Sequence, residues 1–109
     1  MTSKTRRALG VANERGRGAS APPAAARRWT LLTRSYCHLC DELREALLPL
    51  IRGTDVRLCE VDVDAHPPLD AIYGERVPVL FAGAIEADRE ICALRLDRAR
   101  VMAALADER

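Results

Sequence analysis

Two cysteines separated by two residues, Cys37 and Cys40, have the clearest capacity for chemistry in this 109-residue sequence. They follow an apolar stretch, residues 29–33, whose aromatic and β-branched side chains predict a buried strand. After them, apolar side chains recur at the three- and four-residue spacing of a helix over residues 37–52. The spacing therefore predicts that the cysteine pair lies where a strand ends and a helix begins.

A helix N-terminus stabilises a thiolate because its first N–H groups are unpaired and carry the positive end of the helix dipole. We therefore expect Cys37 to face outward, to have a lowered thiol pKa and to act as a nucleophile. Cys40 lies one turn further along, where it can attack a mixed disulfide formed on Cys37, and is assigned as the resolving thiol. His38, between them, has two interpretations of equal weight: a positive charge that stabilises the thiolate, or a solvated surface imidazole.

Two further cysteines lie outside this motif. Cys59 alternates with apolar residues in a predicted central strand and is interpreted as a small buried hydrophobe. Cys92 lies at the last predicted strand, where core packing is favoured over a third thiol at the reactive site. A zinc site is the rival interpretation of the cysteines, but the sequence has no second close-spaced pair of ligands, so we expect no metal.

Charge is distributed unevenly along the chain. Residues 1–28 carry seven Lys and Arg against one acid, whereas residues 29–109 carry ten Arg against fifteen acids. The first segment has too few large apolar side chains to form a core, so a disordered basic tail is expected there. The alternatives are a transit peptide and a segment that binds nucleic acid or anionic lipid. The tail lacks the aromatic residues and the amphipathic face that these roles use, which favours a solvated extension. Because no aromatic residues are interleaved with the basic ones in the tail, we expect no nucleic acid as a partner. With no run of eighteen apolar residues, we also expect no membrane-spanning segment and no membrane partner.

Residues 29–109 predict one domain with the element order β-α-β-α-β-β-α. The later elements are a strand at 56–63, a short helix ending at 74, strands at 77–81 and near 90–93, and a helix at 96–106. Crossovers through helices imply a parallel strand pair, and the final hairpin adds antiparallel strands. We therefore expect an α/β fold with a mixed four-stranded sheet between helices.

Apolar spacing predicts the inner faces of the two later helices. On the short helix these residues are Leu69, Ile72 and Tyr73. On the closing helix, for which Asp97 is the expected N-cap, they are Val101, Met102 and Leu105.

Six short motifs in this order resemble the small bacterial glutaredoxin-like group of the thioredoxin superfamily. They are Cys37-His38-Leu39-Cys40-Asp41, Val61-Asp62-Val63-Asp64, Tyr73-Gly74, Val77-Pro78-Val79-Leu80, Glu90-Ile91-Cys92 and Leu96-Asp97. The resemblance covers residues 29–106 and implies a thioredoxin-like, glutaredoxin-like three-layer fold. It further implies a monomeric, cytoplasmic thiol–disulfide oxidoreductase with no bound cofactor. Its substrates would be disulfide-bonded or glutathionylated proteins, with glutathione as a co-substrate and a glutathione- or thioredoxin-type reductant.

The resemblance also implies roles for residues around the cysteines. It implies a cis Val77–Pro78 bond that leaves the backbone of Val77 free to pair with an extended thiol substrate. Arg34 falls where glutaredoxins often carry a basic residue that meets the glutathione carboxylate, and Tyr36 is expected to support the site. Dithiol glutaredoxins usually differ at three places, which here read His38-Leu39, Arg76 and Cys92-Ala93-Leu94. The alternative function is a non-catalytic redox-sensing or metal-binding module of the same fold.

Overall fold

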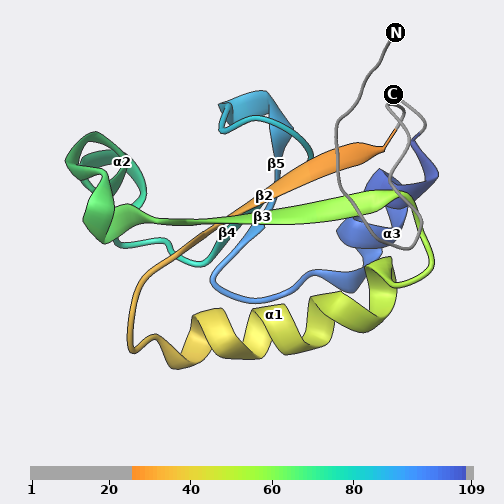
Figure 1. The fold of residues 1–109 in the computed structure, drawn as a ribbon, viewed down its shortest axis with the longest axis horizontal. Helices are drawn as coiled ribbons and strands as arrows, with labels where there is room; N and C mark the ends of the chain where they lie inside the picture. The colour runs from red at the N-terminus through yellow and green to blue at the C-terminus, as the bar shows by residue number, and fades with distance from the viewer. Residues whose placement is uncertain (1–25, 108–109) are drawn as a thin grey trace, which may run out of the picture.

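The computed structural model describes residues 26–107, so the predicted basic tail at residues 1–28 lies outside this part except for its last three residues. The elements follow the predicted order β-α-β-α-β-β-α (Figure 1). They are β2 (Arg27–Thr33), α1 (His38–Ile51), β3 (Val56–Asp62), α2 (Pro67–Tyr73), β4 (Val79–Phe81), β5 (Glu90–Ala93) and α3 (Arg98–Ala106). Two 3₁₀ turns, η1 (Val63–Ala65) and η2 (Ala87–Arg89), precede α2 and β5.

The four strands form one mixed sheet in the order β3-β2-β4-β5. β2 pairs with β3 in parallel, through the crossover helix α1, and with β4 in antiparallel. The β4–β5 hairpin completes the sheet, with an irregularity in its register between Leu80 and Phe81. The predicted mixed sheet is confirmed.

The two faces of the sheet carry separate apolar clusters, which create the three layers. Leu31 of β2 packs with Leu47 of α1 and Val101 of α3 in one cluster. Its neighbour Leu32 belongs to the other cluster, against which Tyr73 of α2 packs. Alternation along β2 therefore places α1 and α3 on one face and α2 on the other.

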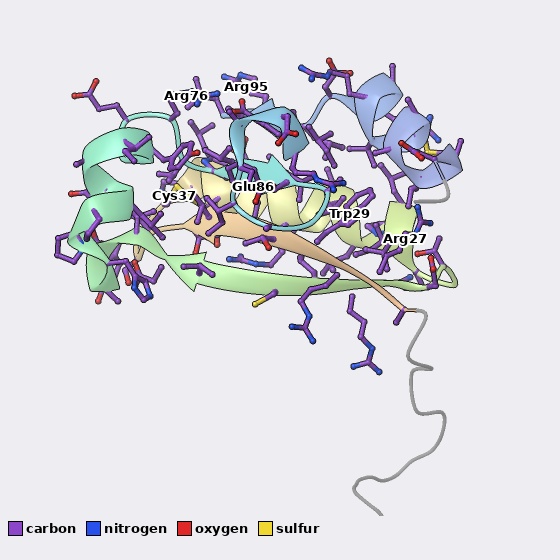
Figure 2. The ribbon with its side chains drawn as sticks, turned by 90° about the horizontal axis from the view of Figure 1, so that it is seen from above. Arg27, Trp29, Cys37, Arg76, Glu86 and Arg95 are labelled. Carbon is purple, nitrogen blue, oxygen red and sulfur yellow. A yellow bond between two sulfur atoms is a disulfide. The ribbon has the colours of Figure 1, made fainter. Side chains whose placement is uncertain are left out.

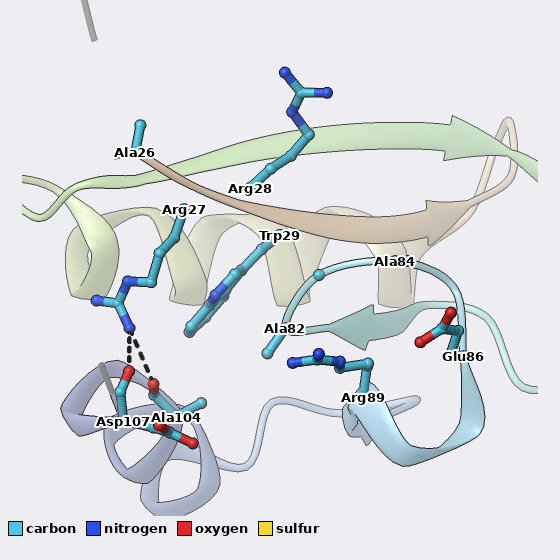
Figure 3. A pocket seen from close by; sticks show the side chains of 11 residues that line it. Ala26, Arg27, Arg28, Trp29, Ala82, Ala84, Glu86, Arg89, Ala104 and Asp107 are labelled. Atoms are coloured by element: carbon cyan, nitrogen blue, oxygen red, sulfur yellow. Dashed lines mark hydrogen bonds between the residues drawn. The ribbon is translucent and has the colours of Figure 1, made fainter. Parts of the chain in front are cut away.

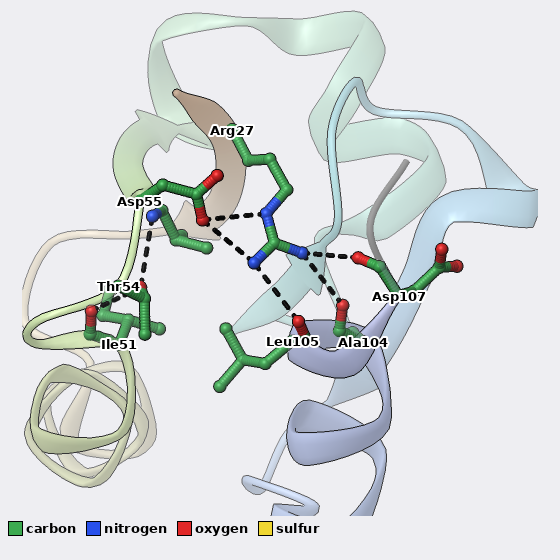
Figure 4. A network of polar contacts seen from close by, with 8 residues as sticks. Arg27, Ile51, Thr54, Asp55, Ala104, Leu105 and Asp107 are labelled. Atoms are coloured by element: carbon green, nitrogen blue, oxygen red, sulfur yellow. Dashed lines mark hydrogen bonds and ion pairs between the residues drawn. The ribbon is translucent and has the colours of Figure 1, made fainter. Parts of the chain in front are cut away.

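The start of β2 is tied to the end of α3 by the guanidinium of Arg27 (Figure 4). It donates to the carbonyl oxygens of Asp107 at 2.6 Å, Leu105 at 3.2 Å and Ala104 at 3.3 Å. It also donates to Asp55 Oδ1 at 3.0 Å, directly before β3. A cation at the carbonyl groups of the last turn stabilises the C-terminus of α3. Backbone pairing with β3 also begins at Arg27, opposite Val56, so the strand starts two residues before its predicted start at Trp29.

Two predictions about helix faces are wrong. Ile72 is 67% exposed and Met102 is 44% exposed. In α3, Val101 is buried and Leu105, one turn later, packs on the same cluster, so Met102, about 100° around the helix, faces away. The same rotation takes Ile72 away from the sheet that its neighbour Tyr73 contacts.

The prediction that Cys59 is buried is also wrong, since its side chain is exposed and its thiol is free. The reason is strand order: β3 pairs with β2 alone among the described strands and is an edge of the sheet. An edge strand has a neighbour on one side, so its side chains are covered less completely.

Candidate active site

The two motif cysteines meet at the N-terminus of α1 and are joined by a disulfide, with a Cα–Cα distance of 5.2 Å. Cys37 is the N-cap residue, and its Sγ accepts a hydrogen bond from the backbone N–H of Cys40 at 3.1 Å. Cys37 is half-buried, whereas Cys40 is only 1% exposed. A reagent approaching from solvent therefore meets the sulfur of Cys37 first, and the helix N–H groups lie where charge on that sulfur would be stabilised.

The chain enters the helix through a tight turn at Ser35 and Tyr36. Tyr36 has a φ of 57° and its side chain is fully exposed. A left-handed conformation is uncommon for a residue with a Cβ. The turn thus presents an aromatic ring to solvent directly beside Cys37.

Three segments that are distant in sequence meet at the dithiol. Val77 belongs to the same apolar cluster as Cys40, and both Cys37 and Ala93 pack against that cluster. The Val77–Pro78 peptide bond is cis, and the carbonyl oxygen of Pro78 accepts a hydrogen bond from the N–H of Leu94 at 2.8 Å. The structure therefore places the residues before β4 and after β5 around the cysteine pair, as Figure 2 shows for Cys37 at the end of the sheet near α2.

Arg34 is engaged by acidic side chains. Its guanidinium forms ion pairs with Asp70 of α2 and with Asp64 of η1, the latter at 3.3 Å, and donates to the carbonyl oxygen of Gly74 at 3.3 Å. Glycine is favoured at position 74 because a Cβ there would lie 2.5 Å from the backbone carbonyl oxygen of Asp70. Arg34 is thus held against the α2 region.

Of the remaining sequence candidates, Cys92 lies apart from this junction and His38 lies beside it. Cys92 is 5% exposed and packs with Trp29 in the cluster that faces α1 and α3, away from the cluster that holds Cys40. Burial raises the pKa of the Cys92 thiol. His38 is exposed beside the cysteines. Within residues 26–107, no group of three His, Cys, Asp or Glu side chains is placed to hold a metal ion.

A hollow of about 570 Å³ lies at the opposite end of the sheet (Figure 3). It is lined by the first residues of β2, the hairpin loop and the end of α3, and Trp29 and Arg89 are among its walls. None of its lining residues belongs to the segments that meet at the dithiol, so it is separate from that site.

Sequence reasoning missed three residues that shape the site: Asp64, Asp70 and Leu94. The two aspartates occur in ordinary polar positions, and their attraction to Arg34 becomes visible only when the segments come together. Leu94 has a φ of 70° and is 43% exposed, neither of which its residue type indicates.

Comparison with known proteins agrees with this arrangement of fold and dithiol. Residues 28–106 match the family described as a glutaredoxin-like domain (DUF836), so the chain belongs to that family. Its structure is similar to the solution NMR structure of protein Ne2328 from Nitrosomonas europaea, at 30% identity and a TM-score of 0.62, covering 81% of this chain and 96% of that one. It is also similar to the X-ray structure of protein XcR50 from X. campestris, at 35% identity and a TM-score of 0.54, covering 72% and 95% of the two chains.

The family and the structural neighbours confirm the predicted glutaredoxin-like α/β fold. The search of curated proteins finds no match to the chain. In the part of the chain that the structure describes, no helix has the length and apolar character needed to cross a membrane.

Proposed function

We propose that this protein is a glutaredoxin-like thiol–disulfide oxidoreductase in which Cys37 is the nucleophile and Cys40 the resolving thiol. The observation that carries the proposal is the asymmetry of the pair. Cys37 caps the helix, accepts its N–H hydrogen bond and is accessible, whereas Cys40 lies behind it in the core. This arrangement separates the sulfur that attacks from the sulfur that resolves.

In the proposed reaction, the thiolate of Cys37 attacks one sulfur of a substrate disulfide. A Cys37–substrate disulfide forms, and the other substrate sulfur leaves as a thiolate that takes up a proton. Cys40, having lost its proton, then attacks Sγ of Cys37 and releases the second substrate thiol. The substrate gains two electrons and two protons, and the protein is left with the Cys37–Cys40 disulfide, the form seen here. A thiol reductant of the glutathione or thioredoxin type reopens it by the reverse exchange.

The residues around the dithiol would hold the substrate chain. The backbone of Val77, immediately before Pro78 and close to the start of β4, would pair with the residues beside the substrate cysteine. The exposed free thiol of Cys59 fits a reducing compartment, which supports the cytoplasm as the site of action. We infer that the protein acts as a monomer without a resident cofactor.

Turnover with a thiol reductant tests the proposal. Wild-type protein should accelerate the reduction of a disulfide substrate, and the Cys37→Ser variant should lose that acceleration. Cys59→Ser is the matched control, because it removes an exposed thiol outside the dithiol site and should leave turnover unchanged. If the Cys37–Cys40 disulfide opens and closes reversibly but no substrate is turned over, the protein is a redox sensor instead.

A further inference from the structure

The environment of the dithiol favours one class of disulfide. We propose, building on the oxidoreductase function above, that the site takes a disulfide on a protein whose cysteine has apolar neighbours, and that it discriminates against glutathione. Two independent features carry this inference: the pairing of the nearby arginines and the apolar side chains beside Cys37.

Two arginines near the site, Arg34 and Arg76, are ion-paired with carboxylates. A hollow of about 570 Å³ beside α2 is lined by charged side chains of both signs, namely Arg34, Asp70, Glu75 and Arg76. Arg34 is already bound to two aspartates, which leaves the group with a net negative charge.

Arg76, which directly precedes Val77, is ion-paired with Glu90 of β5. Glutathione carries two carboxylates and one ammonium group, so its carboxylates would have to displace the aspartate and glutamate side chains or lie beside them. Either route costs affinity, because carboxylates that lie close together repel one another and an existing ion pair must break before its cation is free.

The second feature is a pair of large apolar side chains held outside the core. Tyr36 is fully exposed next to Cys37. Leu94 is 43% exposed, and its own N–H donates to the carbonyl oxygen of Pro78. Both have a positive φ, at 57° and 70°. Such backbone strain in residues other than glycine is concentrated at functional sites.

Together these side chains form an apolar rim, defined here as Tyr36 and Leu94, on two of the segments that meet at the dithiol. Glutathione has little apolar surface to cover such a rim, whereas a protein segment with aliphatic or aromatic residues beside its cysteine would bury it. Arg95, which follows Leu94, is exposed and could pair with a carboxylate of either substrate. The contribution of Arg95 is therefore tested with a variant of its own.

The test compares kcat/KM for four disulfides with the same protein preparation. Two are peptides of equal length with a single disulfide, flanked by Leu and Phe in one and by Ser in the other. The third is glutathione disulfide, and the fourth is a small uncharged disulfide such as hydroxyethyl disulfide. We expect the apolar peptide to exceed the Ser peptide and glutathione disulfide by about tenfold or more, the factor that burial of roughly one half-exposed aliphatic side chain supplies.

The variants separate the two features. Tyr36→Ser and Leu94→Ser should each lower kcat/KM severalfold for the apolar peptide and lower it far less for the small disulfide. Met102→Ser, on α3, is the matched control because Met102 is 44% exposed and lies outside the site, and it should change neither. Asp70→Asn should raise kcat/KM for glutathione disulfide, because it releases part of the charge on Arg34.

The outcomes distinguish the two levels of the argument. If no disulfide is turned over, including the small one, the oxidoreductase function itself fails. If the small disulfide is reduced but the two peptides are equal, or glutathione disulfide is the best substrate, only the inference about substrate class is overturned. Glutathione turnover that is high in wild type and lost in Arg95→Met would likewise overturn it. So would a concentration-dependent dimer that Tyr36→Ser or Leu94→Ser abolishes, because the rim would then be covered by a second copy of this chain.

Discussion

The order in which the two motif cysteines react with a limiting alkylating reagent follows directly from their positions. Less than one equivalent of iodoacetamide is added to the reduced protein at pH 7. The protein carries the substitutions Cys59→Ser and Cys92→Ala, so that Cys37 and Cys40 are its only cysteines. Cys37 should be modified first, because it is half-buried at the start of α1 whereas Cys40 is 1% exposed.

The size of the preference can be worked from the hydrogen bond between the N–H of Cys40 and Sγ of Cys37, at 3.1 Å. A hydrogen bond to a charged acceptor contributes about 1.5–3 kcal/mol, which at about 1.4 kcal/mol per factor of ten raises the thiolate population roughly 10- to 150-fold. A less basic thiolate is a weaker nucleophile, with a Brønsted coefficient of about 0.4–0.5, so roughly 3- to 20-fold survives in the rate. Burial of Cys40 multiplies this factor, because reagent reaches it only when the first turn of α1 opens.

We therefore expect Cys37 to be alkylated at least about tenfold faster than Cys40. Quenching at short times, followed by digestion and mass spectrometry, measures the ratio directly. A Cys40→Ala variant should keep the rate of Cys37 within about a factor of three, since the N–H at position 40 remains. Equal rates, or faster reaction of Cys40, would refute the assignment of the nucleophile.

Three further predictions follow from the structure outside the dithiol. In the native protein, Cys59 should react with a thiol reagent within seconds to minutes, whereas Cys92 should react only when the protein unfolds. Fast labelling of Cys92 would contradict its place in the core. Burial raises the pKa of the Cys92 thiol, so above about pH 8.5, where an unfolded thiol loses its proton, the free energy of unfolding should fall as pH rises. In the Cys92→Ala variant, the free energy of unfolding, measured by urea titration, should fall less between pH 8 and pH 10. An unchanged fall would count against a raised pKa of Cys92 in the folded protein. Arg27→Met should lower the free energy of unfolding by about 1–2 kcal/mol, because the hydrogen bonds of Arg27 at the end of α3 are lost. Arg28 is an exposed neighbour, so the control variant Arg28→Met should change the free energy of unfolding by less than about 0.5 kcal/mol.

Features that depend on short stretches of chain could be predicted from the sequence. The element order was predictable because strand and helix periodicities differ and breakers separate them. Asp97 was identified as the N-cap of α3, and its side chain does accept the N–H of Arg100. The location of Cys37 at a helix start is likewise a local property of the pattern around it.

Features that depend on strand order and long-range pairing could not be predicted. The pattern around Cys59 is the same for a central and an edge strand, and only the sheet order decides that it is exposed. Arg34 meets Asp70 across a sequence separation of 36 residues, so the sequence showed a basic residue near the dithiol but not that carboxylates already occupy it. The left-handed backbone of Leu94 depends on the tie to Pro78 and has no signature in its residue type.

Trapping of the mixed disulfide tests the central claim, that Cys37 attacks and Cys40 resolves, most directly. Reduced Cys40→Ser protein is incubated with a one-disulfide peptide, quenched with acid and analysed intact and after digestion by mass spectrometry, with Cys37→Ser treated in parallel. The account predicts one peptide per protein, bound to Cys37, in the first variant and no accumulated adduct at Cys40 in the second. An adduct that accumulates on Cys40, or the absence of any adduct on Cys37, would contradict it.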